Sequence, residues 1–290
     1  MSVFSALDTA VSGLASQSHA FTDIGNNIAN SQTTGYKATD TTFADYVLNS
    51  EALEGSSSTT VARTQQRTEN QGTITNSANK LALAISGHGF FNVVRDNGGS
   101  GSATTFQTRQ LYTRNGDFSQ NNDGYLVNTS GEYLEGYVAG ADGQPNTAAL
   151  QPINVGNITY RPDPADLPGA AIPNFTGVSM TSDGSVMASF DNGRTQLVAR
   201  IPLATFADAD SLDAQNGQSY SATVDSGTAT LGYAGTGPVG DLETSAVEGS
   251  TTSLDTDLTK LIVAQQAYGA NAKVVTTANE MLQTVLAMKQ

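Results

Sequence analysis

The two ends of this chain carry the same seven-residue apolar repeat, and almost nothing between them does. Steps that alternate between three and four residues place one stripe along one side of a helix, which suits packing against another helix. We therefore predict a helix at each end. The large apolar positions of the two stripes are Phe4, Leu7, Val11, Leu14, Phe21 and Ile28, and then Leu254, Leu258, Leu261, Tyr268, Val275, Leu282 and Leu286.

Small or polar residues interrupt both stripes, for example Ser18 and Gly25 in the first and Gln265 and Asn279 in the second. A lone two-stranded coiled coil with these interruptions would be weak, whereas helices packed among many copies tolerate them. Two interpretations stay open. The stripes either form contacts between copies, or they close the core of a monomer as ordinary amphipathic helices.

The net charge and the composition of the chain limit the kinds of molecule that it can bind. Charged residues make up 14% of the 290 residues, against about a quarter in an average protein, and Ser, Thr, Asn, Gln and Gly take their place. Such residues suit turns and hydrated strand faces. The net charge of -14 repels nucleic acid and anionic membranes, so we predict neither partner. Because the chain has no cysteine, disulfides and thiolate metal sites are excluded.

Strand signals dominate from about residue 80 onward. Four dipeptides that tolerate left-handed turns divide this region into short antiparallel strands. We expect 124–127 to pair with 133–136, and 186–190 to pair with 196–201. The four dipeptides are Asn115-Gly116, Asp123-Gly124, Asp183-Gly184 and Asn192-Gly193. The predicted fold class is α+β, with long terminal helices that form a coiled-coil-like inner domain and a β-rich antiparallel middle domain.

The predicted domains follow from these patterns. Residues 1–30 and 252–290 form a helical assembly domain, and 76–250 form a β-rich domain with a small inserted lobe at 138–177. The polar stretch 31–75 is expected to be a weakly structured connector. Its first residues are of types that favour turns and should end the N-terminal helix. Gly35 can take a positive φ there.

Catalytic and ligand-binding patterns are scarce. His19 and His88 stand far apart in different contexts, the glycines at 235–240 enclose Pro238, and the acidic cluster at 208–213 lacks the spacing of a calcium loop. We therefore predict no catalytic, cofactor or metal site. An extracellular β-rich binding module or adhesin, and an enzyme with a site assembled from distant residues, remain alternatives.

Targeting signals are also missing from the sequence. No window of 18 apolar residues predicts a membrane span, and the first residues lack both a basic leader and an unbroken apolar segment. We expect a chain that is either cytoplasmic or exported without a cleaved signal.

Residues 23–47 resemble the signature of the bacterial flagellar rod and hook family. In that signature an Asn-Asn-x-Ala-Asn core precedes Thr-x-Gly-Tyr/Phe-Lys. The matching positions here are Asn26, Asn27, Ala29, Asn30, Gly35, Tyr36 and Lys37. Three further blocks, 81–93, 112–137 and 258–290, agree with the family in the same order. Within the family, 4–31 and 183–212 are most similar to hook members, with distal rod members as the alternative.

The resemblance implies a structural subunit of the bacterial flagellum that is exported by the flagellar type III apparatus and lies outside the cell. It implies that the subunit polymerises with itself into a helical tube and meets neighbouring axial proteins, such as distal rod and hook–filament junction proteins, and a hook cap during assembly. The terminal helices would line the export channel. A hook member would act as a universal joint that passes motor torque to the filament.

Overall fold

The computed structural model describes residues 3–48, 57–98, 106–140, 142–156, 158–162 and 172–288. The chain forms two compact units, one made of 1–32, 38–67 and 252–290, and the other of 33–37 and 68–251. Two terminal helices and a middle of antiparallel strands confirm the α+β class. The elements are α1 (Val3–Ala29), β1 (Thr39–Leu48), β2 (Ser57–Gln66), β3 (Ile74–Asn76), β4 (Leu83–Ser86), β5 (Phe90–Val94), β6 (Leu111–Thr113), β7 (Phe118–Gln120), β8 (Leu126–Asn128), β9 (Tyr133–Val138), β10 (Gln151–Pro152), β11 (Phe175–Met180), β12 (Ser185–Phe190), β13 (Thr195–Arg200), β14 (Leu203–Thr205), β15 (Asp213–Gln215), β16 (Ser219–Ser221), β17 (Thr230–Gly232), β18 (Asp241–Thr244), β19 (Ala246–Glu248) and α2 (Leu254–Ala287).

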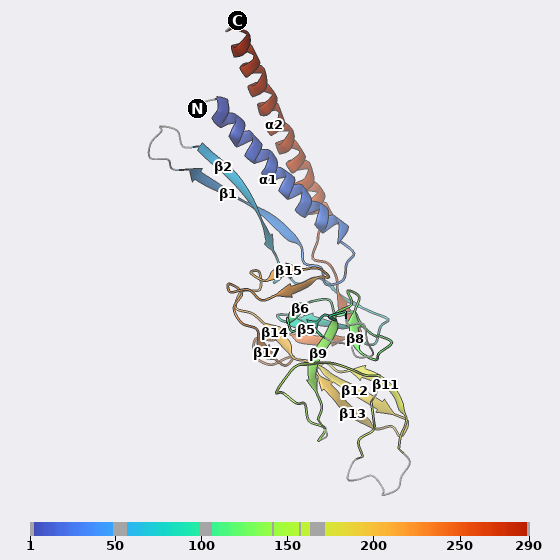
Figure 1. The fold of residues 1–290 in the computed structure, drawn as a ribbon. Coiled ribbons are helices and arrows are strands. Elements are labelled where there is room, and N and C mark those ends of the chain that lie inside the picture. The colour runs from blue at the N-terminus through green and yellow to red at the C-terminus, as the bar shows by residue number, and fades with distance from the viewer. Residues whose placement is uncertain are drawn as a thin grey trace. The chain divides into compact units, whose positions relative to one another are not determined.

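The helical unit contains α1, α2 and a long hairpin of β1 and β2, and α1 contacts both the other helix and the hairpin (Figure 1). The hairpin register runs from Thr39 opposite Gln66 to Leu48 opposite Ser57. The sequence analysis predicted a weakly structured connector here, and the structure differs. The reason is that the polar stretch is rich in threonine, whose branched side chain favours an extended backbone and whose hydroxyl bonds to α1, as described below.

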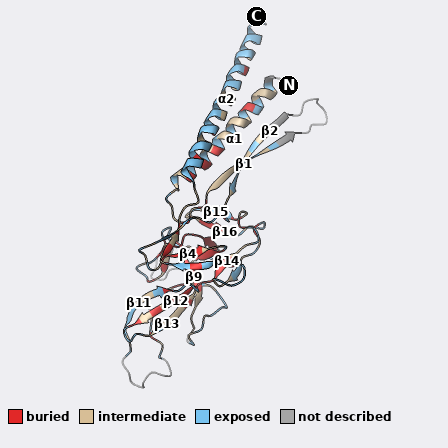
Figure 2. Ribbon diagram, turned by 180° about the vertical axis from the view of Figure 1, so that it is seen from behind, coloured by how far each residue is buried: buried red, intermediate tan, exposed pale blue. Residues whose placement is uncertain are grey.

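The β-rich unit holds the main apolar core. Its largest sheet has the central strand order β11-β12-β13-β9-β5-β6-β16-β15, and all of these neighbours are antiparallel. Fully buried side chains such as Leu83, Phe91 and Leu203 come from different strands and pack into one cluster. Figure 2 shows buried residues gathered in these strands, whereas α2 is largely exposed.

Both predicted strand pairs are confirmed, because β8 pairs with β9 and β12 pairs with β13. Between β9 and β11, in the predicted lobe at 138–177, the described residues contain the short strand β10, which pairs with β9. The predicted lobe lies partly outside the described residues, at 141, 157 and 163–171.

The predicted turn glycines divide into two kinds. Gly124, Gly184 and Gly193 have φ between 77° and 84°, as tight turns require. Gly116 is not left-handed, and its prediction as a tight turn was wrong. A Cβ at Gly116 would lie 1.7 Å from the carbonyl oxygen of Leu83, so glycine is needed there for close backbone approach.

Gly35 combines both constraints. Helix α1 ends at Ala29, and after a series of turns Gly35 has φ +72°, which confirms the positive φ expected of it. Its N–H donates to the carbonyl oxygen of Glu248 at 2.8 Å, and a Cβ would lie 2.6 Å from the backbone nitrogen of Asn115. Residues 33–37 are therefore a strap seated closely against the β-rich unit.

We expect Gly35→Ala to lower the free energy of unfolding by more than the ~1–3 kcal/mol typical of backbone strain, because the new methyl group also meets backbone atoms. Gly98→Ala is the matched control, since Gly98 has φ +67° and open space around its Cβ position. Urea titration followed by tyrosine fluorescence measures both variants. Equal losses in the two would show that the contact with Asn115 adds nothing.

Candidate assembly surface

Helix α2 packs against α1 through a row of small and polar residues spaced seven apart. Asp257, Ala264 and Ala278 are its buried residues, and Asn271 lies between the two alanines. A Cβ at Gly13 of α1 would lie 2.6 Å from Nδ2 of Asn271, which marks a close approach of the helices. The ring of Phe21 meets that of Tyr268 edge-on at 6.1 Å. Small side chains allow the two helices to lie close together.

The predicted C-terminal stripe is rotated by one residue from this contact row. Its members divide into a half-buried set and an exposed set. Half-buried are Leu261, Val275 and Leu282, whereas Leu254, Leu258, Tyr268 and Leu286 are exposed. The predicted stripe does not include Asp257, Ala264, Asn271 and Ala278, although their seven-residue spacing was a signal that could have revealed them.

The predicted N-terminal stripe divides in the same way. Its half-buried members are Leu7, Leu14, Phe21 and Ile28, and its exposed members are Phe4 and Val11. The buried apolar residues of α1 are instead Ala10, Ala20 and Ile24. Whether the stripe positions form contacts between copies stays a prediction.

A second face of α1 binds the hairpin through hydrogen bonds. Ser16 donates to the carbonyl oxygen of Thr60 at 2.8 Å. The carboxylate of Asp23 accepts from the hydroxyls of Thr41 at 2.6 Å and Thr64 at 3.0 Å. His19 lies 3.6 Å from the same carboxylate. Because Ser16 and Asp23 are buried, these bonds satisfy polar groups that would otherwise destabilise the unit.

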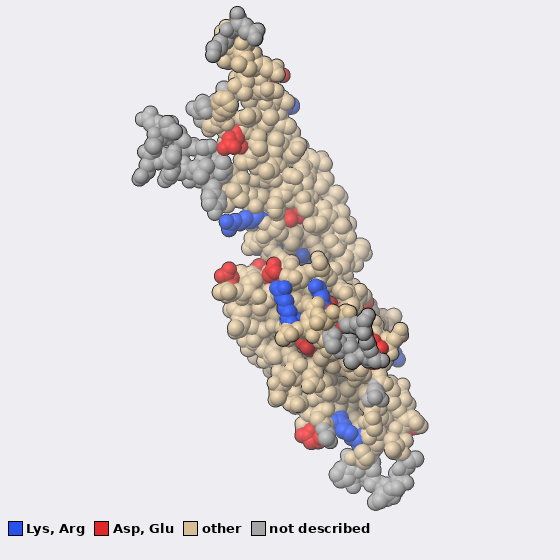
Figure 3. All heavy atoms as spheres, viewed as in Figure 1, with Lys and Arg blue, Asp and Glu red and all other residues tan. Residues whose placement is uncertain are grey.

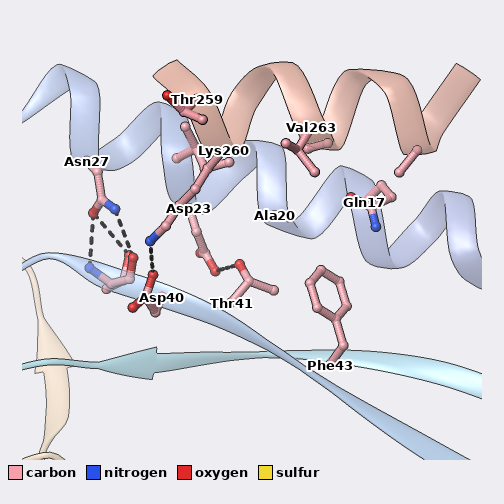
Figure 4. A pocket seen from close by; sticks show the side chains of 14 residues that line it. Gln17, Ala20, Asp23, Asn27, Asp40, Thr41, Phe43, Thr259, Lys260 and Val263 are labelled. Atoms are coloured by element: carbon pink, nitrogen blue, oxygen red, sulfur yellow. Dashed lines mark hydrogen bonds and ion pairs between the residues drawn. The ribbon is translucent and has the colours of Figure 1, made fainter. Parts of the chain in front are cut away.

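Asn27 of the family motif continues this face. Its amide nitrogen donates to the carbonyl oxygen of Thr39 at 2.8 Å, and its amide oxygen accepts from the N–H of Thr39 at 3.0 Å (Figure 4). Asn27 also bonds the side chain of Asp257. One asparagine thus joins α1, β1 and α2.

Two carboxyl groups near this point have opposite pKa shifts. The hydrogen bond from Lys260 lowers the pKa of Asp40, and the attraction of Lys260 and Arg67 lowers it further. Burial raises the pKa of Asp257, whose Oδ2 has no hydrogen-bond partner among the described residues. Asp40 therefore keeps its charge to a lower pH than a free aspartate, and Asp257 takes up its proton at a higher pH.

Helix α2 and the residue that caps it carry most of the exposed large apolar side chains in the described part of the chain, and they lie on several sides of the helix. Charged side chains are sparse on the face of the molecule that Figure 3 shows. The exposed large apolar residues of α2 are Leu254, Leu258, Ile262, Val263, Tyr268, Val274, Met281, Val285 and Leu286, and the capping residue Met288 is exposed as well. Soluble monomers rarely leave so many large apolar side chains in water, so α2 is a candidate interaction surface.

The remaining motif residues end α1 and begin the strap. Ala29 and Asn26 are exposed, and the carbonyl oxygen of Asn26 accepts from both the backbone and the side chain of Asn30. The carbonyl oxygen of Tyr36 accepts from the N–H of Thr251 at 3.1 Å. These contacts fix the path of the chain after the helix.

Lys37, the last motif residue, belongs to a buried ionic cluster in the β-rich unit. Its ammonium lies 2.6 Å from Glu248 and also donates to the carbonyl oxygen of Asn70. Arg114 approaches the other oxygen of Glu248 at 3.3 Å, and the N–H of Gly72 donates to Glu248 at 2.7 Å. Burial lowers the pKa values of Lys37 and Arg114, and Glu248 opposes this in both. The sequence analysis missed Glu248 and Arg114, whose partners are distant in the chain.

The described residues contain no group of three or more His, Cys, Asp or Glu side chains that could hold a metal ion. Asp210 instead accepts from the hydroxyl of Thr68 and the N–H of Glu69, which gives that acidic turn a structural role. In the part of the chain that the structure describes, neither helix is long and apolar enough to cross a membrane.

Models of known protein families match three separate parts of the chain. Residues 7–37 match the flagella basal body rod protein family, 84–188 match the D1 domain of the flagellar hook protein FlgE/F/G, and 243–288 match the C-terminal domain of the flagellar basal body rod FlgEFG protein. A flagellar basal-body rod protein FlgG of Bacillus subtilis is 30% identical over 298 residues, which cover 98% of each chain. The chain belongs to the flagellar hook and rod protein family. The resemblance of residues 23–47 is thereby confirmed.

Hook members of this family are also similar to the chain. A flagellar hook protein FlgE of Rhizobium meliloti is 25% identical over 416 aligned residues, with full coverage of both chains. A flagellar hook protein FlgE of Caulobacter vibrioides is 39% identical over 122 residues, which cover 42% of this chain and 21% of that one. The chain is a structural hook or rod subunit.

We expect Glu248→Gln to lower the free energy of unfolding of the β-rich unit by ~3–5 kcal/mol, because two buried cations lose their shared counter-charge. Glu243→Gln, at an exposed position on β18, is the matched control and should change stability little. Urea titration measures both. A small effect of Glu248→Gln would mean that the cluster does not depend on this charge.

We expect the stability of the helical unit to fall as pH rises through the raised pKa of Asp257. A carboxyl group whose folded pKa exceeds its unfolded value of about 3.9 favours folding below that value and loses the contribution at higher pH. Asp257→Asn should remove this component. Thermal melts between pH 3 and 7, followed at the helical dichroism band, give the difference between variant and parent. Asp255→Asn, at an exposed position two residues earlier, is the control, and the same difference in it would refute the assignment.

Proposed function

We propose that this chain is the subunit of the flagellar hook, polymerising into a flexible helical tube that passes motor torque to the filament. Residues 1–30 and 252–290 would be the inner assembly domain, 31–75 the connector, and 76–250 the outer domain. The exposed apolar side chains of α2 carry the assembly part of this proposal. The proposed function is structural and includes no enzymatic step.

Burial of the exposed apolar side chains of α2 against a partner would be favourable. Side chains such as Ile262 and Val263 are 54% and 62% exposed, and each Å² of apolar surface removed from water contributes about 25 cal/mol. Contacts between unlike patches of identical copies build open helical arrays when the rotation does not close. Family membership supports the copies themselves as that partner.

The choice of hook over rod rests on local identity. The 122-residue match to the hook protein of Caulobacter vibrioides reaches 39%, above the 30% of the full-length match to the rod protein. The distal rod is the second candidate, because the rod protein aligns at nearly the length of this chain. The alignment with the hook protein of Rhizobium meliloti is longer than the chain, so that relative contains segments that this chain lacks.

The partners and location follow from the same proposal. They are the flagellar type III export apparatus, a hook cap during growth, distal rod and hook–filament junction proteins at the two ends, and the extracellular part of the flagellum. A bending joint also needs outer contacts that can slide. The sparse charges support this, since polar uncharged surfaces form wet contacts that tolerate small shifts.

We expect Ile262→Glu to block polymerisation of the purified chain, because a charge would enter an apolar contact, while the helical dichroism of the monomer stays unchanged. Gln266→Glu, one turn further along the exposed face, adds the same charge where a polar residue already stands and is the control. Sedimentation and electron microscopy measure the polymer. Normal tubes from Ile262→Glu would place this face in solvent.

Immunogold labelling of isolated hook–basal bodies separates hook from rod. Label on the curved segment outside the envelope supports the hook, and label confined to the rod within the envelope would replace it with the distal rod.

A further inference from the structure

The β-rich unit contains four Asn-Gly pairs, the dipeptide that is most prone to spontaneous deamidation. In this reaction the backbone nitrogen of the glycine attacks the side-chain carbonyl carbon of the asparagine, and ammonia leaves. Glycine favours the attack because it has no side chain to obstruct it. The pairs are Asn97-Gly98, Asn115-Gly116, Asn192-Gly193 and Asn216-Gly217.

The structure protects three of these pairs. Asn115 is fully buried, and hydrogen bonds hold its side chain at both the nitrogen and the oxygen. The N–H of Gly98 donates to Oδ1 of Asp96 at 3.1 Å, and the N–H of Gly193 donates to the carbonyl oxygen of Phe190 at 3.0 Å. A backbone nitrogen whose hydrogen is donated to an acceptor loses its proton less readily and is a poorer nucleophile.

Asn216 and Gly217 lie in the turn between β15 and β16, which Figure 2 labels. The side chain of Asn216 is exposed. Among the described residues, neither this side chain nor the N–H of Gly217 has a hydrogen-bond partner. Both reacting groups of this pair are therefore accessible.

The carbonyl oxygen of Asn216 faces two hydrogen-bond donors. Nη2 of Arg95 donates to it, and the hydroxyl of Ser219 donates to it at 3.1 Å. Glu132 holds Arg95 in place, since its carboxylate accepts from Nε at 3.1 Å and from Nη2 at 2.8 Å. When the nitrogen of Gly217 loses its proton, the negative charge spreads onto the carbonyl oxygen. Donors aimed at the atom where charge develops accelerate such a step.

We propose that Asn216 is a site of spontaneous deamidation, which Arg95 and Ser219 promote. The deprotonated nitrogen of Gly217 forms a bond to Cγ of Asn216, and the bond from Cγ to Nδ2 breaks. Ammonia leaves with a proton from water, and a cyclic succinimide remains. The inference goes beyond the proposed function and does not require the chain to polymerise.

The same two donors favour one of the two products. Water opens the succinimide at Cγ to give aspartate, or at the main-chain carbonyl carbon to give isoaspartate. Arg95 and Ser219 polarise the main-chain carbonyl, and the carboxylate formed there is the group that they already face. Isoaspartate should therefore dominate. It adds a negative charge and one backbone carbon to the turn.

Deamidation of the full-length chain can be followed at every pair in one sample. The chain is incubated in mildly alkaline buffer, digested with pepsin in acid and analysed by mass spectrometry, and an isoaspartyl methyltransferase measures isoaspartate. We expect Asn216 to react faster than Asn192 and Asn115 in the folded chain. In urea the rates should converge, because each asparagine precedes glycine. A folded chain in which Asn216 reacts no faster than Asn192 would overturn the site.

Arg95→Gln tests how the site is promoted. We expect it to slow the reaction of Asn216 by about tenfold, less than the ~10²–10³ of one donor in a water-excluded active site, and to lower the isoaspartate share. Arg109→Gln is the matched control, because Arg109 is an exposed arginine that donates to Ser221 of the same strand β16. A turn that the substitution merely loosens would react faster. An unchanged or faster rate in Arg95→Gln would therefore overturn the role of Arg95.

Discussion

The β-rich unit depends on the ion pairs and hydrogen bonds that the buried carboxylate of Glu248 makes. Glu248 receives Lys37 from the strap, Arg114 from the end of β6 and the N–H of Gly72, and its own carbonyl oxygen receives the N–H of Gly35. Four segments that are distant in sequence thus meet at one residue. Because two cations share one anion in a dry site, each segment is held only while the others stay in place.

The helical unit is organised on a different principle. Its helices meet through alanines and an asparagine, and its hairpin is attached through threonine hydroxyls that bond Asp23. Internal contacts therefore use small and polar side chains. Most large apolar side chains of α2 stay exposed, so the proposed assembly would draw on the hydrophobic effect of burying them between copies.

The sequence predicted the helices, the two strand pairs and the motif because these depend on neighbours in the chain or on spacing along one helix. It could not place the contact face of α2. Leucine was expected at the seam, and the seam holds Ala264 and Ala278, whose small size matters more than their hydrophobicity when helices lie close. The hairpin was missed because its threonines look polar. The ionic cluster was missed because Lys37, Arg114 and Glu248 are joined only by the fold.

Lys37 also reveals how this architecture can vary. Its single ammonium group reaches Asn70 near the start of the long segment 68–251 and Glu248 near its end, so both ends of that segment lie within a few ångströms of each other. A segment whose ends meet can be lengthened or exchanged internally while its attachment keeps the same geometry. Insertions and deletions within the β-rich unit can therefore accumulate during evolution without changing how its two ends are attached. Relatives of very different length can share one set of terminal helices.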